Sequence, residues 1–389
     1  MPLSLYLLAV AVFAMGTSEF MLAGLLPDIA TDLGVSVPTT GWLTSSFALG
    51  MVVGAPLTAA LARRWPMRAG LVGFVGLFLA AHIAGALTDS FPVLLATRVA
   101  AAVANAGFLA LALTAAGSMV PPGRQGRALA VLLSGTTLAT VAGVPAGALV
   151  GALFGWRAAF WAVAVICVPA ALGVLRGIPA HPRAVGAGPR LTDELAVLAR
   201  PRLVAVLAAA ATVNAATFGA FTFLAPLVTD AAGLGALWVP VVLMLFGAGS
   251  FAGVTVAGRF SDSRPGLVVA VAGPLLCAGW VVAALSTGWP MALSALLCVQ
   301  GALSFALGST FIARVLHEAA GAPSMSGSYA TAALNIGAAV GPVTAAAAYG
   351  SRLGVTGPLW VAGALVAVTL LLAVGCRRVF VAGPTAARR

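Results

Sequence analysis

Residues 16–32, GTSEFMLAGLLPDIATD, place a carboxylate inside a stretch that is otherwise apolar enough to cross a membrane. The apolar run extends from Leu3 to Leu26, and a membrane-spanning helix needs about 20 such residues. Glu19 lies seven residues before the end of this run, at a depth of ~10 Å for a helical rise of 1.5 Å per residue. An ionised side chain near the bilayer centre costs at least ~2.5–3.5 kcal/mol on insertion scales. We therefore predict that Glu19 faces a polar path, where it exchanges a proton or pairs with a cation.

The composition indicates an integral membrane protein. Of the 389 residues, 61% are hydrophobic and only 7% are charged, and the mean hydropathy is +1.10. A soluble protein of this length needs more charge to cover its surface. The first apolar run has no positively charged segment before it and no small-residue cleavage site, so we expect a retained span rather than a cleaved signal peptide.

Several classes of chemistry are excluded by what the sequence lacks. All 20 basic residues are arginine, and without lysine there is neither a phosphate-binding Walker A loop nor a Schiff base. The cysteines and histidines are isolated in the sequence, without metal-ligand spacing or a nucleophile–base arrangement. They are Cys167, Cys277, Cys298, Cys376, His82, His181 and His317. We therefore expect no metal, no organic cofactor and no enzymatic activity.

Apolar runs long enough to span a bilayer recur twelve times, separated by short polar or Pro/Gly breaks. They fall near residues 3–26, 39–61, 70–88, 92–119, 128–153, 158–176, 202–225, 237–258, 267–286, 290–313, 326–349 and 357–376. The predicted fold is therefore an all-α integral membrane protein with 12 transmembrane helices.

The arginines predict the orientation of these spans. The connections that follow the second, fourth, sixth, eighth and tenth spans, together with the C-terminal tail, contain 17 of the 20 arginines. The opposite face has only Arg157 and Arg352, and Arg98 is left inside a span. The positive-inside rule then places both termini in the cytoplasm. Because topology explains the net charge of +11, no nucleic-acid partner is needed.

The chain repeats itself with an offset of 199 residues. Gly50 and Gly54 in the second span recur as Gly249 and Gly253 in the eighth. The long polar connection between the sixth and seventh spans separates the two copies. We predict two parallel repeats, with a first bundle at 1–176, a cytoplasmic linker at 177–201, a second bundle at 202–376 and a cytoplasmic tail at 377–389.

Four stretches carry a resemblance to a known family: GTSEFMLAGLLPDIATDLGVSV (16–37), GRALAVLLSGTTLATVAGVPAGALVG (126–151), FGAGSFAGVTVAGRFSD (246–262) and GSYATAALNIGAAVGP (327–342). The chain resembles the major facilitator superfamily, and in particular its 12-helix drug:proton antiporters, among them the bacterial chloramphenicol-resistance exporters. The resemblance implies two pseudo-symmetric six-helix bundles in the bacterial inner membrane. It also implies a protein that exports a small amphipathic drug such as chloramphenicol, with the proton gradient as its energy source. Because nothing in the sequence suggests a dimerisation device, we expect a monomer. Exporters of sugars or nucleosides share much of the same pattern.

Two motifs implied by the resemblance bear on conformational change. The cytoplasmic motif after the second span reads ALARRWPMR (60–68), in which Arg63 occupies the expected aspartate position. Its second copy, GRFSDSR (258–264), keeps Asp262. We assign conformational roles to Arg64, Arg68, Asp262 and Arg264, although the arginines could equally serve topology alone.

The antiporter motif resembles GVPAG (143–147) in the fifth span, with Gly143, Pro145 and Gly147. Small residues there let helices approach closely and a proline bends the span. Ordinary Gly/Ala packing is the alternative.

Arg98 is the expected partner of Glu19. It lies about six residues inside the fourth span, at a depth of ~9 Å that matches the depth of Glu19. The family has an arginine at this position, and its first and fourth helices line the central cavity. We predict that both residues share one polar pocket in which burial disfavours the carboxylate and Arg98 favours it. A permanent structural ion pair, or a passive facilitator whose polar path includes Glu19, are the alternatives.

The substrate pocket is expected at the membrane midplane between the bundles. A neutral aromatic amide with hydroxyl groups requires apolar walls and a few hydrogen-bonding side chains. Candidates within spans are Asn105, Asn214, Phe218, Phe221, Gln300 and Asn335. Aromatic residues in a helical bundle also serve packing or face lipid.

Overall fold

The computed structural model describes residues 2–61, 66–121, 124–178, 194, 196–260, 264–322 and 325–375. Every regular element in these ranges is a helix, which confirms the predicted all-α fold. Eleven helices within them are long and apolar enough to cross a membrane. In addition, α4 (Trp42–Leu61) has 20 residues without a charged side chain and occupies the predicted second span. The twelve predicted spans are thus all helical.

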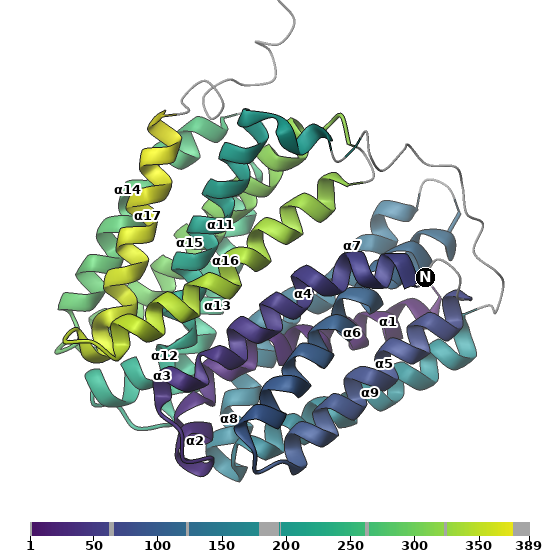
Figure 1. Ribbon diagram of the computed structural model, residues 1–389, viewed down its shortest axis with the longest axis horizontal. Helices are drawn as coiled ribbons and strands as arrows, with labels where there is room; N and C mark the ends of the chain where they lie inside the picture. The colour runs from purple at the N-terminus through teal and green to yellow at the C-terminus, as the bar shows by residue number, and fades with distance from the viewer. Residues whose placement is uncertain are drawn as a thin grey trace, which may run out of the picture. The chain divides into compact units, whose positions relative to one another are not determined.

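The chain divides into two compact units, residues 1–186 and 187–389. In the first unit (purple to blue in Figure 1), the first span consists of α1 and a following 3-10 helix, and the fifth is interrupted by a π turn. Its helices are α1 (Leu3–Phe20), α2 (Leu26–Asp32), α3 (Val37–Thr40), α4 (Trp42–Leu61), α5 (Met67–Leu87), α6 (Phe91–Ser118), α7 (Gln125–Leu138), α8 (Val144–Phe154) and α9 (Trp156–Gly177). Only Gly155 separates α8 from α9, and its φ of 83° is a conformation that glycine adopts without strain.

The second unit (teal to yellow in Figure 1) follows the same order of long helices. Its helices are α11 (Pro201–Thr222), the three-residue α12 (Leu224–Pro226), α13 (Trp238–Gly258), α14 (Pro265–Leu285), α15 (Pro290–Glu318), α16 (Ser326–Tyr349) and α17 (Gly357–Gly375). Most of the predicted linker (177–201) and the whole predicted tail (377–389) lie outside the described residues.

Helix packing within each unit repeats the sequence symmetry. In the first unit α4 packs on α6, α5 on α6 and α9, and α1 on α7 and α9. Their counterparts pair in the same way in the second unit, where α13 packs on α15, α14 on α15 and α17, and α11 on α16 and α17. Equivalent spans therefore make equivalent contacts, as expected for a duplicated bundle.

The repeated glycines lie at helix crossings. A Cβ added to Gly249 would lie 1.9 Å from Cys298 O, and one added to Gly253 would lie 2.0 Å from Ala302 O, so α13 and α15 touch through their backbones. In the first unit the equivalent Gly50 is looser, with the nearest atom, Ala102 Cβ, at 2.7 Å. Membrane helices associate largely through such close packing of small residues.

Candidate functional site

Arg98 is a buried cation of the first unit and lies on α6, seven residues after the first residue of that helix, Phe91. Its side chain is 1% exposed. Its Nη1 donates to Ser18 Oγ and its Nη2 donates to Ser18 O, each at 2.8 Å. The guanidinium also lies 4.5 Å from the ring centroid of Phe47 on α4. Two charge-assisted hydrogen bonds and a cation–π contact thus compensate for its removal from water.

Ser18 connects Arg98 to a histidine that the sequence had left without a role. His82 on α5 is 1% exposed, and its Nε2 lies 2.7 Å from Ser18 Oγ. On its other side, Nδ1 lies 2.8 Å from Phe78 O. Sequence reasoning treated His82 as isolated because its side-chain partner, Ser18, is 64 residues away along the chain. A polar side chain placed alone in the third span was the available signal, since such residues are rarely placed in membrane spans without a reason.

Glu19 lies at the end of α1, just before the 3-10 helix Met21–Gly24. It is half-buried, and its Oε2 accepts a hydrogen bond of 3.4 Å from Asn105 Nδ2 on α6. The predicted association of Glu19 with Arg98 is therefore indirect: Glu19 contacts the helix that carries Arg98, while Arg98 binds the residue next to Glu19. Among the described residues no ion pair joins the two groups.

The predicted antiporter motif lies where the fifth span crosses the first. A π turn, Ala139–Gly143, precedes Pro145, which lacks the N–H that an α-helix would direct at Val141. A Cβ added to Gly143 would lie 2.1 Å from Thr17 Oγ1, and one added to Gly147 would lie 3.2 Å from Met21 Cβ. The motif therefore packs against the residues that flank Glu19, so a shift of this crossing would move Glu19.

The predicted polar substrate residues differ in placement. In the second unit, Asn214 Nδ2 donates to Leu334 O on α16 at 2.6 Å, and Asn335 Nδ2 donates to Thr331 O of its own helix at 3.0 Å. Gln300 is 0% exposed and its Nε2 donates to Leu276 O on α14 at 3.0 Å. Gln300 therefore fills the α14–α15 interface, and the prediction of a substrate contact there does not agree with its burial.

Four phenylalanines form a string in the second unit, and two of them were predicted substrate residues. Phe218 and Phe221 of α11 have ring centroids 6.2 Å apart. Phe221 continues to Phe246 of α13 at 5.1 Å, and Phe246 to Phe305 of α15 at 6.4 Å. Phe218, Phe221 and Phe305 are partly exposed. Asn214 precedes Phe218 by one helical turn, which places an amide beside an aromatic surface, as a drug pocket requires.

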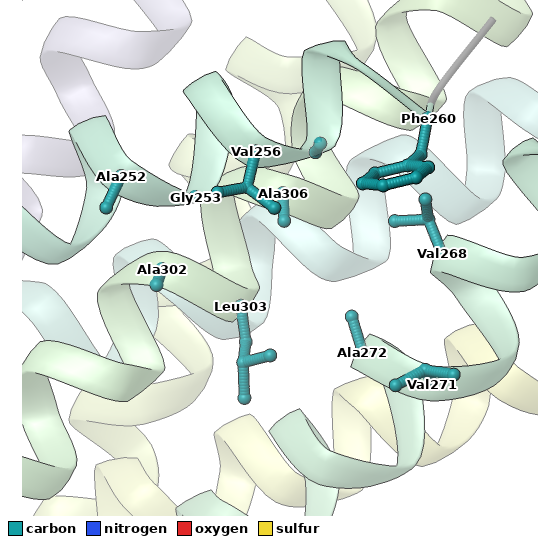
Figure 2. A pocket seen from close by; sticks show the side chains of 11 residues that line it. Ala252, Gly253, Val256, Phe260, Val268, Val271, Ala272, Ala302, Leu303 and Ala306 are labelled. Carbon is teal, nitrogen blue, oxygen red and sulfur yellow. The ribbon is translucent and has the colours of Figure 1, made fainter.

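A separate groove of about 290 Å³ lies between α13, α14 and α15. Figure 2 shows that its lining consists of small and aliphatic side chains with Phe260 at one end. Among the described residues that line it, none carries a hydrogen-bonding side chain. Such a surface suits lipid chains rather than a polar drug, and we do not assign it to the transport site.

The cytoplasmic motif is only partly visible. Arg64 and Asp262 lie outside the described residues. Arg68 is the second residue of α5 and is half-buried, whereas Arg264 is exposed and directly precedes α14. The structure therefore places Arg68 and Arg264 at equivalent helix starts.

Arg157 connects three elements at the opposite end of the first unit. Its guanidinium pairs with Asp32 of α2 and with Asp89 Oδ1, the latter at 2.6 Å, and donates to Thr88 O at 3.1 Å. Trp156 Nε1 also donates to Asp32 Oδ2, at 3.0 Å. The hydrogen bond from Arg157, and to a smaller extent that from Trp156, holds the pKa of Asp32 below its ordinary value of 3.8. We call this set of residues the latch.

Replacing Arg157 with alanine should lower the apparent Tm of the detergent-solubilised protein by a few degrees at pH 7, since exposed pairs each contribute up to ~1 kcal/mol. A group whose folded-state pKa is depressed stabilises the fold above its unfolded pKa and loses this effect as pH falls. The difference between variant and parent should therefore narrow below about pH 4. Arg352→Ala, at an exposed arginine assigned to the same face, is the control. An equal shift for both variants would contradict the latch.

Comparisons with known proteins identify the family of the chain. The Major Facilitator Superfamily profile matches residues 8–342. The chain is 66% identical over 392 aligned positions, 100% of both chains, to a chloramphenicol resistance protein of Streptomyces lividans. It is 31% identical over 377 positions, 94% of both chains, to the inner membrane transport protein YdhP of Escherichia coli (strain K12).

Solved structures show the same fold at low identity. A bacterial homolog of the human lysosomal transporter Spinster, in an inward-facing and occupied conformation, superposes with a TM-score of 0.72 and 18% identity over 97% of this chain and 95% of the other. The nucleoside transporter NupG gives a TM-score of 0.72 at 13% identity, over 97% and 99% of the two chains. The twelve helical spans and the duplicated bundle agree with the fold of these structures. Because the family profile and the relative of 66% identity match most or all of its length, the chain belongs to the major facilitator superfamily of multi-pass membrane transporters.

Proposed function

We propose that this protein is a proton-coupled exporter of small amphipathic drugs, with chloramphenicol as its principal substrate and antibiotic resistance as the result. The observation that carries the proposal is an acid on the first span, Glu19, beside a buried arginine on the fourth. Full-length identity of 66% to a chloramphenicol resistance protein supports the choice of drug.

Coupling follows from competition for the proton of Glu19. Partial burial favours the neutral acid, whereas Arg98 and the amide of Asn105 favour the carboxylate. Neutral Glu19 crosses between access states at low cost, and ionised Glu19 requires hydration or bound cargo. A proton moving through 100 mV supplies ~2.3 kcal/mol, which is roughly a 50-fold concentration ratio of a neutral solute. One proton per drug molecule is therefore sufficient, and no cofactor is required.

The candidate drug-contacting side chains of the second unit are Asn214, Phe218, Phe221 and Asn335, and the candidate of the first unit is Asn105. Aromatic rings supply apolar contact area, and the amides supply orientation through hydrogen bonds. The protein acts as a monomer in the bacterial inner membrane with both termini in the cytoplasm. The distribution of arginines supports this orientation. No enzymatic step is part of the proposed cycle, and the chain belongs to the Major Facilitator Superfamily.

Transport in everted vesicles tests the proposal. Energised vesicles that contain the protein should accumulate chloramphenicol and release protons on its addition, and an uncoupler should abolish both. A drug-sensitive host should gain resistance to chloramphenicol in a panel that includes unrelated antibiotics, and sugars and nucleosides should not compete. Downhill movement of drug that persists with an uncoupler, without proton release, would identify a passive facilitator instead.

A further inference from the structure

Hydrogen bonds connect His82 to Ser18 and Ser18 to Arg98, and neither Ser18 nor His82 has a role in the cycle described so far. Both are buried, with exposures of 0% and 1%. They come from two different spans, α1 and α5. Ser18 contacts Arg98 of a third span, α6, and His82 contacts Ser18. Phe78 and Phe160 enclose the imidazole, with ring centroids at 4.2 and 5.7 Å. The cluster is thus an internal connection among three helices of one unit.

The hydrogen bonds of this cluster have a defined direction. A carbonyl only accepts, so Phe78 O receives the hydrogen on Nδ1 of His82. In the neutral ring Nε2 is then an acceptor, and Ser18 Oγ donates its hydrogen to it. The remaining lone pairs of Ser18 Oγ point away from His82 and accept from Arg98 Nη1. His82 therefore determines which way the hydroxyl of Ser18 faces.

We propose that Ser18 and His82 are positioning residues that hold the Arg98 guanidinium on the hydroxyl and carbonyl of Ser18, and so keep it from pairing directly with Glu19. This inference rests on the proposed function, because it explains how Glu19 stays free to gain and lose a proton.

The alternative partner of the guanidinium is only one residue away. Glu19 follows Ser18, and a direct Arg–carboxylate pair would be bidentate and charge-assisted. Such a pair would hold Glu19 in its ionised form and end its exchange of protons. Two hydrogen bonds to Ser18 and the ring of Phe47 together offset the attraction of the carboxylate. Without the His82 acceptor, the Ser18 side chain rotates so that its hydroxyl donates to a carbonyl of its own helix. This rotation moves Oγ away from Arg98, and Nη1 loses its acceptor.

Labelling of Glu19 with a hydrophobic carbodiimide provides a test that needs no drug, because the reagent modifies the protonated carboxyl. At pH 7, His82→Leu and Ser18→Ala should each lower the labelling rate of Glu19, read by mass spectrometry, roughly fivefold, as the loss of one net hydrogen bond predicts. His82→Gln retains an acceptor near the position of Nε2 and should restore the rate. Thr97→Val is the matched control, because the Thr97 hydroxyl is buried next to Arg98 but donates to Leu94 O of its own helix.

Unchanged labelling in both His82→Leu and Ser18→Ala would overturn the inference, as would an equal decrease in Thr97→Val. Failure of His82→Gln to restore labelling would also overturn it, since the ring itself would then be required. If His82→Leu does not fold, Ser18→Ala carries the same prediction. A parent protein that labels as expected but accumulates no drug would refute the proposed function and leave the positioning role intact.

Discussion

Glu19→Gln should reduce the energised accumulation of chloramphenicol in everted vesicles from as much as ~50-fold per 100 mV to the equilibrium ratio near one. Glutamine has the size of the protonated acid and can keep the hydrogen bond from Asn105. It cannot release a proton, so drug-induced proton release should also disappear. Exchange of labelled for unlabelled drug across the membrane should continue, because the neutral side chain still permits the change of access.

Asp28→Asn provides the matched control for this result. Asp28 is an exposed acid in α2, nine residues after Glu19, and its replacement removes the same charge without touching the polar cluster. Accumulation in this variant should equal that of the parent protein. Energised accumulation that survives in Glu19→Gln would refute Glu19 as the coupling residue, even if the protein still confers resistance.

Gly249→Ala should prevent accumulation of folded protein in the membrane. The added Cβ would lie 1.9 Å from Cys298 O and 2.9 Å from Cys298 C, both backbone atoms that cannot rotate away. Helices α13 and α15 would have to separate along their whole crossing. Overpacking costs ~1–3 kcal/mol in ordinary cores and more where the backbone must move. Quantitative blotting and size-exclusion chromatography in detergent measure the loss.

Gly73→Ala is the control for this variant, because Gly73 is an exposed residue in α5 and a Cβ there would meet nothing within 4 Å. Alanine favours a helix by up to ~1 kcal/mol over glycine. The amount of folded Gly73→Ala protein in the membrane should therefore be at least that of the parent. Gly50→Ala should have an intermediate effect, since its nearest obstacle is a side-chain atom at 2.7 Å. Equal yields for all three variants would contradict a backbone contact at the α13–α15 crossing.

The repeated glycines show which features of the helix crossings could be predicted from the sequence and which could not. Their offset of 199 residues predicted equivalent positions in two bundles, and the packing of α4 on α6 and of α13 on α15 matches that prediction. The sequence did not predict that the second crossing is the tighter one. The difference depends on how closely two backbones approach, which neighbouring side chains along both helices determine together.

Gln300 and His82 illustrate the opposite case. Both are polar residues in largely apolar helices, and the sequence favoured Gln300 as a substrate contact while leaving His82 without a role. The structure buries Gln300 against Leu276 O and connects His82 to the site through Ser18. The spans are apolar around most of their circumference, so hydrophobic periodicity does not reveal which face turns inward.

The sequence by itself determined the membrane class, the twelve spans, the duplication and the two intramembrane charges, Glu19 and Arg98. A bilayer imposes length and hydropathy on each span separately, so these features are local and can be read one helix at a time. Only the tertiary structure decided that Arg98 binds Ser18, that Asn105 binds Glu19 and that His82 joins them. These contacts connect residues 64, 80 and 86 positions apart, and they depend on the rotation of each helix about its axis, which packing against the other helices fixes.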